Sequence, residues 1–106
     1  MRAGQLKDFV TIQRPVAQSD SAGQRSEWEV HVKAYAEVVQ LQGKELVTAR
    51  QIFSSVTTRV RLRYFDGAGV DASMQVLVDG RVLDILSVID LNRKHETLEL
   101  MCGEAA

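Results

Sequence analysis

The chain has 106 residues, of which 45% are hydrophobic, and a formal net charge of −1 from 13 basic and 14 acidic side chains. This length suits one hydrophobic core and is short for two, so we expect a single domain over residues 1–106. The charges are spread along the chain, which gives no sign of a basic nucleic-acid arm or a membrane-binding surface. No apolar run approaches the roughly 20 residues that span a bilayer, and Met1–Gly4 leads into no signal-peptide core. Because Cys102 is the single cysteine, an internal disulfide is excluded, and we expect a protein of the reducing cytoplasm.

The first predicted strand covers Asp8 to Arg14, with Val10 and Ile12 as its buried side. Pro15 is expected to end it, because a proline cannot donate a hydrogen bond to a strand ladder. A polar loop follows over residues 16–25.

A second and longer alternating stretch runs from Ser26 to Val39. Its predicted apolar side consists of Trp28, Val30, Val32, Ala34, Ala36 and Val38. Fully extended, the stretch would span on the order of 45 Å. That is more than a small barrel uses, so we expect this strand to bend or to project.

A short helix is predicted next, from Lys44 to Phe53. Gln42 and Gly43 interrupt the alternation, and one helical face then carries Leu46, Ala49, Arg50 and Phe53. A helix of about 10 residues depends on packing rather than on intrinsic propensity.

The clearest strand lies within residues 56–64. Its predicted buried side is Val56, Thr58, Val60, Leu62 and Tyr64, and its other side carries Thr57 and the arginine row Arg59, Arg61 and Arg63.

The chain then predicts a hairpin, in which Met74–Val78 and Arg81–Asp90 flank the turn residues Asp79 and Gly80. In that register the core face is Met74, Val76, Leu83 and Ile85. The opposite face would carry Leu77, Val82, Leu86 and Val88, which needs cover from elsewhere in the chain or from another subunit. A last strand, Glu96 to Cys102, completes a meander. We therefore predict an all-β fold, a small six-stranded β-barrel or sandwich with one short helical insertion between strands 2 and 3.

The histidines, the cysteine and the glycine-rich loop show no pattern typical of an enzyme active site. His31 and His95 are far apart and one cysteine is present, too few ligands for a zinc site, so both histidines are interpreted as solvated surface residues. Cys102 is interpreted as a buried, inert thiol, since no base is near it. No phosphate-binding or nucleophile motif is present, and Gly67–Gly69 precedes no helix and is interpreted as a turn. We predict no catalytic, metal or cofactor site.

Two interpretations of the arginine row remain open. Its guanidinium groups could contact phosphates, as in a small nucleic-acid-binding β-barrel, or could pair with acids such as Glu99 and Glu96 of a neighbouring strand or make a subunit contact. The negative net charge and the lack of stacking aromatics on this face favour pairing or a subunit contact. Trp28 and Phe53 are interpreted as core or interface anchors.

Several segments occur in an order that resembles the head–tail joining proteins of tailed bacteriophages. They are Met1–Leu6, Val10–Pro15, Glu27–Trp28, Ala36–Val38 running to Gly43–Glu45, Thr57–Tyr64, Gly80–Ile85 and Ser87–Asp90. The resemblance implies a structural virion protein of a phage or prophage, assembled in the host cytoplasm. It would form a homo-oligomeric ring below the portal and adaptor proteins, help to retain the packaged DNA, and bind tail proteins. It would meet DNA only through the channel, need no cofactor or membrane, and could be a monomer in isolation.

The resemblance also indicates which residues make contacts. The segment 41–54 would either reach towards the channel, with Gln42, Gly43, Lys44 and Glu45 as candidate channel-facing residues, or pack as a helix on a neighbouring subunit. The candidate subunit or connector interface consists of Trp28, Leu46, Arg50, Phe53, Arg59, Arg61, Arg63, Leu77 and Leu86. A ring needs two different complementary faces, and one hypothesis sets the arginine row against Glu27, Glu29 and Glu37 of the next copy.

Overall fold

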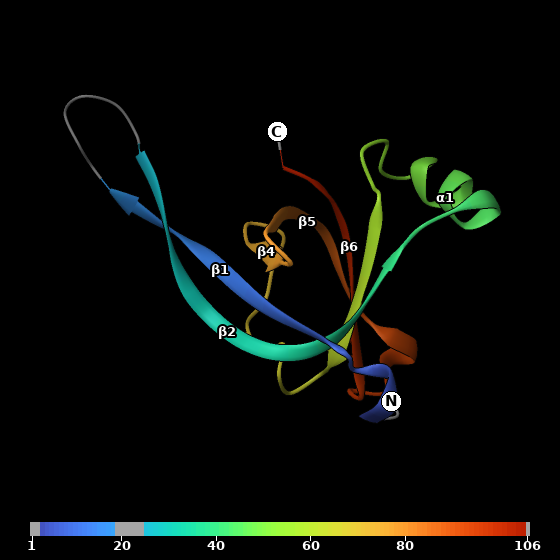
Figure 1. Ribbon diagram of the computed structural model, residues 1–106, viewed down its shortest axis with the longest axis horizontal. Helices are drawn as coiled ribbons and strands as arrows, with labels where there is room; N and C mark the ends of the chain where they lie inside the picture. Colours follow the sequence, from blue (N-terminus) through green and yellow to red (C-terminus); the bar gives the residue numbers. More distant parts are fainter. Residues whose placement is uncertain (1–2, 19–24, 106) are drawn as a thin grey trace.

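The computed structural model describes residues 3–18 and 25–105. In this part of the chain, six antiparallel strands close into a barrel in the order β1-β2-β3-β6-β5-β4 (Figure 1). The strands are β1 (Asp8–Gln18), β2 (Arg25–Gln40), β3 (Thr58–Arg63), β4 (Gln75–Val78), β5 (Arg81–Asp90) and β6 (Thr97–Glu104). The helix α1 (Gly43–Arg50) lies between β2 and β3, and two 3₁₀ turns are η1 (Ala3–Gln5) and η2 (Leu91–Arg93). The predicted all-β fold with one helical insertion is confirmed, and it is a barrel rather than a sandwich.

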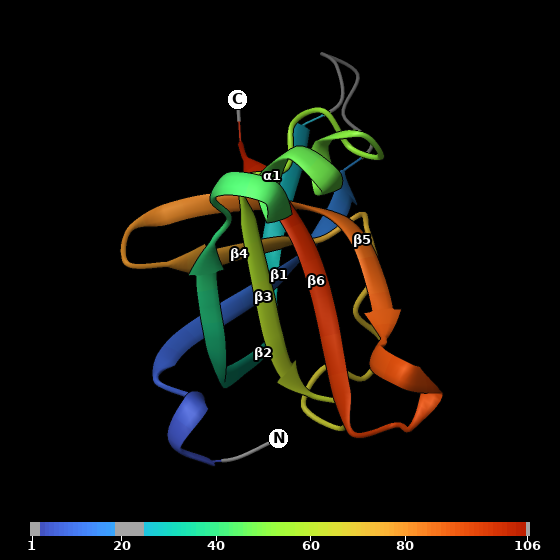
Figure 2. The ribbon, with the colours of Figure 1, turned by 90° about the vertical axis from the view of Figure 1, so that its right-hand side faces the viewer.

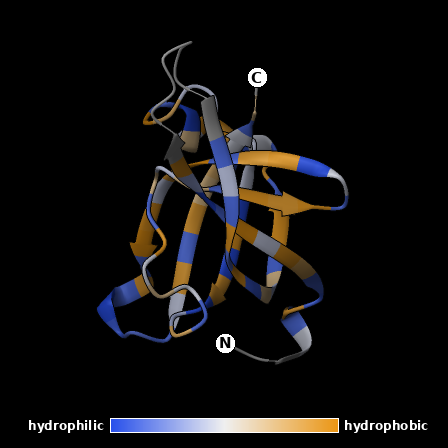
Figure 3. Ribbon diagram, turned by 90° about the vertical axis from the view of Figure 1, so that its left-hand side faces the viewer, coloured by the Kyte–Doolittle hydropathy of each residue, from blue (hydrophilic) through white to orange (hydrophobic). Residues whose placement is uncertain are grey.

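The core fills the barrel with one face of each strand. Apolar and polar residues alternate along the strands, as the colouring of Figure 3 shows. The fully or almost fully buried side chains include Val10, Ile12, Ala36, Val60, Leu62, Val76, Leu83, Ile85, Leu100 and Cys102. The alternation predicted for β3 is confirmed, because Thr58, Val60 and Leu62 are buried and the arginines between them are not.

The turn between β4 and β5 has the predicted geometry. Asp79 and Gly80 both have positive φ, at 49° and 75°, as a type I′ turn requires. Val78 pairs with Arg81 and Val76 with Leu83, so the predicted register is confirmed.

β1 and β2 extend beyond the barrel as a two-stranded ribbon, here called the arm (residues 14–18 and 25–30). Figure 1 shows the arm curving away from the barrel at the end opposite α1. β2 is one strand of 16 residues, and the expectation that it bends or projects is confirmed. The prediction that Pro15 ends β1 is wrong, because Pro15 lies within the strand and pairs with Trp28. Beyond Gln13 no described strand pairs with the second edge of β1, so a missing N–H is tolerated there.

A β-bulge in β2 reverses the faces of the arm. Ile12 pairs with Val32 but Gln13 pairs with Val30, which leaves His31 as an extra residue. Directly paired residues share a face of the sheet, so Val30 lies on the outer face with Gln13. Trp28 lies on the same outer face, opposite Pro15. The predicted continuous apolar side from Trp28 to Val38 is therefore wrong at its start.

A second bulge, at Leu86 in β5, changes the hairpin in the same way. Ile85 pairs with Cys102 and Ser87 with Met101, so Leu86 is the extra residue. As a result Val88 faces inwards, pairs with Leu100 and packs against the core. The prediction that Val88 shares the outer face with Leu77 and Val82 is wrong.

α1 lies across the end of the barrel near β3 and β6 (Figure 2). The predicted helix ends at Phe53, three residues beyond the observed end at Arg50, because residues 51–52 form a turn. No α1 side chain is buried, and Leu46 and Ala49 are half-buried. Arg50 is exposed, although its Nε donates to the Val56 carbonyl oxygen. No helix in the described ranges is long and apolar enough to cross a membrane.

Candidate interaction surfaces

The arginine row lies on the outer wall of the barrel and is largely paired with acids of the same chain. The Arg61 guanidinium lies 2.8 Å from a carboxylate oxygen of Glu99, its register partner on β6. Arg59 pairs with Glu45 of α1 and lies 4.0 Å from Glu37 of β2. The predicted cross-strand pairing with Glu99 is confirmed, and the predicted pairing with Glu96 is wrong. Arg63 has no ion-pair partner among the side chains that the structure describes.

Glu37 lies beside the arginine row rather than on an opposite surface. It is the register partner of Arg61 on β3 and lies next to Arg59. The hypothesis that sets the row of one copy against Glu37 of the next is therefore wrong for this residue. Glu29 pairs with Arg14 on the arm.

A groove of about 440 Å³ separates α1 from the outer wall of β3 and β6. Its lining includes Ala49 and Ile52 on the helix side and Arg59, Glu99 and Met101 on the barrel side. The Nε of Arg59 is buried and has no hydrogen-bond partner in the described part of the chain. The ion pair of Arg59 with Glu45 thus joins the helix to the barrel wall across this groove.

Apolar side chains are exposed at two opposite ends of the molecule. At one end, Trp28 and Val30 of the arm are exposed. At the other, Val47 of α1 is 62% exposed and Ile52 beyond it is 76% exposed. The arm and α1 lie at the two ends of the longest axis, which measures 46 Å (Figure 1).

The remaining predicted interface residues fall into separate groups. Leu46 and Arg50 lie on α1 and Phe53 follows it, and the Arg50 Nε donates to the Val56 carbonyl at 3.2 Å. Leu77 and Leu86 are half-buried on β4 and β5. The candidate channel residues Gln42, Gly43, Lys44 and Glu45 lie exposed at the start of α1. Their role at the channel stays a prediction.

Sequence reasoning missed an exposed aromatic pair on β1 and β2. Phe9 and Tyr35 are register partners and their rings contact edge to face, with centroids 5.1 Å apart. They are 52% and 57% exposed. The signal that could have found them is an aromatic residue at a position where alternation expects a polar one.

The two histidines make specific contacts. His95 is exposed, as predicted, and its ring stacks on Tyr64 with centroids 4.7 Å apart while its Nε2 lies 3.1 Å from an Asp90 carboxylate oxygen. His31 is half-buried and its Nε2 lies 2.7 Å from the Ala68 carbonyl oxygen, so the interpretation as a solvated residue is wrong for it.

Cys102 is a buried thiol, as predicted. Burial raises its pKa to about 12, with a smaller contribution from the Asp84 carboxylate. Such a thiol is a poor nucleophile at neutral pH. Within residues 3–18 and 25–105, no three side chains of metal-ligating type lie together.

The sequence profile of the phage head completion protein family matches residues 1–105. The chain belongs to this family. Head completion proteins are structural components of the virion and not enzymes. The outer surfaces of this family member, rather than a catalytic cleft, are therefore the candidate functional sites.

Two solved structures are similar to this head completion protein over nearly its whole length. The solution structure of protein SF1141 from Shigella flexneri 2a is 27% identical, with a TM-score of 0.80, and the match covers 100% of this chain and 98% of that one. A chain in the virion of a native gene transfer agent particle is 20% identical, with a TM-score of 0.64, covering 95% of this chain and 96% of that one. The second likeness shows a shared fold. No functionally curated protein matches the chain.

Proposed function

We propose that this head completion protein forms a ring below the portal and adaptor proteins of a phage head, joins the head to the tail, and helps to retain the packaged DNA. The main support for a ring is that two different apolar surfaces, one on the arm and one on α1, lie at opposite ends of the barrel. Contacts between two different surfaces of one subunit are heterologous, and they generate a ring when the rotation closes.

The arm and α1 each expose groups that a partner protein would cover. A two-stranded ribbon is marginally stable on its own in water, and the arm extends with no described strand on its outer edges. α1 buries no side chain, although it presents Val47 to solvent and is followed by the exposed Ile52. A neighbouring subunit or connector protein that covers either surface would remove exposed apolar area from water.

The charges of the barrel support a connector over the alternative, a free nucleic-acid-binding barrel. Arg59 and Arg61 are engaged by Glu45 and Glu99 of the same chain and are not available as free cations for phosphates. Affinity for nucleic acid depends mainly on such free cations. The net charge of −1 points the same way.

Deletion of the gene from its phage or prophage tests the proposal. After induction, we expect negative-stain electron microscopy of the lysate to show heads and complete tails apart, with heads that have lost their DNA. Supplying the wild-type protein from a plasmid should restore joined, infectious particles. Intact infectious particles from the deletion strain would contradict the joining role.

The ring itself is tested in the complemented particles. Image averaging of the head–tail junction should show added density with rotational symmetry that is absent from heads of the deletion strain. A single copy of the protein at the junction would contradict the ring and leave the joining role standing.

A further inference from the structure

The barrel wall has a window where β2 and β3 separate. β3 pairs with β2 from Gln40 back to Ala36, and its last pair joins Ala36 to Leu62. Beyond this pair the chain of β3 turns away and pairs only with β6, at Arg63 and Thr97. The loop after β3 returns to β2 at His31, whose Nε2 contacts the Ala68 carbonyl. Between these two contacts, no described strand pairs with the edge of β2 from Val32 to Tyr35.

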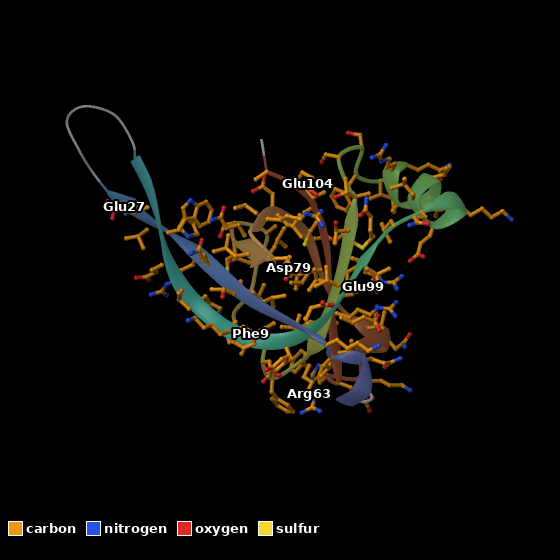
Figure 4. All side chains as sticks on the ribbon, in the orientation of Figure 1. Phe9, Glu27, Arg63, Asp79, Glu99 and Glu104 are labelled. Carbon is orange, nitrogen blue, oxygen red and sulfur yellow. The ribbon has the colours of Figure 1, made fainter. Side chains whose placement is uncertain are left out.

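Aromatic and basic side chains surround this window. A hollow of about 470 Å³ is lined by Leu6, Phe9, Lys33, Ala34, Tyr35, Arg63 and Asp66, here called the notch. Figure 4 shows Phe9 and Arg63 on the lower side of the barrel, away from Glu104. Neither Lys33 nor Arg63 has an ion-pair partner among the described side chains, so the two cations outnumber the single acid, Asp66.

We propose that the notch binds an extended acidic segment of a partner protein, which adds to the free edge of β2 at Val32–Tyr35. Main-chain hydrogen bonds of an added strand give affinity, and pockets for alternate side chains give specificity. Four residues of edge span about 13 Å, which suits a segment of similar length. An apolar side chain of the segment would pack on Phe9 and Tyr35, and its carboxylates would pair with Lys33 and Arg63.

Two features favour a peptide over a single-stranded nucleic acid. The free main-chain groups of β2 match the main chain of a peptide, whereas a nucleic acid offers no such ladder. Phe9 and Tyr35 contact edge to face, so they do not form the open stacking platform that single-strand binders use.

Nuclear magnetic resonance on the ¹⁵N-labelled full chain tests the proposal. The probe is an acetylated and amidated hexapeptide with aspartate at its first and fifth positions, leucine at its third and threonine at the others, so that an extended strand presents the aspartates and the leucine on one face. The control peptide replaces the aspartates with lysines. We expect saturable shifts at Val32–Tyr35 and Arg63 with the acidic probe alone. Amide hydrogen exchange at Val32–Tyr35 should slow in the complex, because strand addition protects these N–H groups and a purely electrostatic contact would not.

Charge reversal provides the matched variants. The double variant Lys33→Glu with Arg63→Glu should bind the acidic probe about tenfold more weakly, since each exposed pair contributes modestly. Lys44→Glu, which changes an exposed cation of α1 outside the notch, should alter affinity by less than about twofold. The spectra of the unbound variants show directly whether each is folded.

Three results would overturn the proposal: no saturable binding, shifts that map outside the notch, or a short oligothymidylate that competes for the same residues. The inference relies on the proposed function only in expecting the partner to be another virion protein. Failure of the probe experiment would leave the deletion phenotype and the joining role unchanged. Intact particles from the deletion strain would likewise leave peptide binding at the notch unchanged.

Discussion

The chemistry of Cys102 follows from its place on the inner face of β6. It pairs across the sheet with Ile85 and is fully buried. Burial disfavours the charged thiolate, which raises the pKa of the thiol from its ordinary value of 9.0 to about 12. In the unfolded chain the thiol would lose its proton at lower pH than in the barrel.

This difference predicts a pH dependence of stability. Below pH 9 the Cys102 thiol keeps its proton in both the folded and the unfolded chain, so its full contribution to the free energy of unfolding is present. This contribution is lost as the pH rises towards 12, because only the unfolded chain gains stability from releasing the proton. We expect the free energy of unfolding, measured with urea between pH 9 and 12, to fall less steeply for Cys102→Ala than for the wild type. Tyrosine and lysine ionisation is common to both proteins. Equal slopes would contradict the assignment.

Two neighbours on β3 show how the side of a strand sets the cost of a substitution. Leu62 is fully buried, whereas Arg61 is partly exposed and paired with Glu99. Leu62→Ala should lower the free energy of unfolding by about 2–5 kcal/mol through the cavity it leaves. Arg61→Ala should cost less than about 1 kcal/mol, because solvent screens an exposed ion pair. Urea titrations that gave the two variants equal midpoints would refute this order.

At the scale of elements, Arg59 is the principal polar contact between α1 and the barrel. It connects Glu45 of the helix with Glu37 of β2. Arg59→Met keeps the length of the side chain and removes both ion pairs. We expect faster amide hydrogen exchange in Gly43–Arg50 with little change in β5. Lys44→Met, which removes a charge without a described ion pair, is the control and should leave exchange in α1 unchanged.

Gly103 allows the segment that follows α1 to cross β6 closely. A Cβ at this position would lie 2.5 Å from the main-chain oxygen of Ser55, and the Thr57 N–H donates to the Cys102 carbonyl beside it. Gly103→Ala should therefore lower the free energy of unfolding by about 1–3 kcal/mol. Gly4→Ala, whose Cβ would meet nothing within 4 Å, is the control and should have a small effect. Similar urea midpoints for the two variants would show that the crossing relaxes at no cost.

The sequence predicts the features that depend on local residue patterns, and it misses those that depend on how distant strands pair. The alternation of β3 and the Asp79–Gly80 turn are local patterns, so residue types alone reveal them. The bulges at His31 and Leu86 add one residue with no distinctive composition, so the faces beyond them were predicted wrongly. The notch could not be predicted, because it forms where β3 leaves β2, and only the tertiary pairing shows that point.

At the scale of the whole molecule, stability and assembly should depend on different residues. The core lies inside the barrel, whereas Trp28 is exposed on the arm. Trp28→Ser should lower the free energy of unfolding by about 1 kcal/mol, less than Leu62→Ala, because Trp28 is part-exposed and lies outside the core. In the deletion strain it should fail to restore joined particles, because the proposed contact loses its aromatic anchor. Lys94→Ser, on the exposed turn before β6, should restore the wild-type titre. Full rescue by Trp28→Ser would exclude the arm from assembly.

The bulge at His31 lets the arm lose the bulged residue without changing its surfaces. Val30 already lies opposite Gln13 and Trp28 opposite Pro15, with His31 as the extra residue. Loss of a single codon at position 31 would remove the bulge and leave both pairs, and therefore the outer face of the arm, unchanged. Loss of a codon at position 29 would instead place Trp28 opposite Arg14 and move it to the other face of the ribbon. The place of a deletion, more than its size, therefore decides which surface the arm presents.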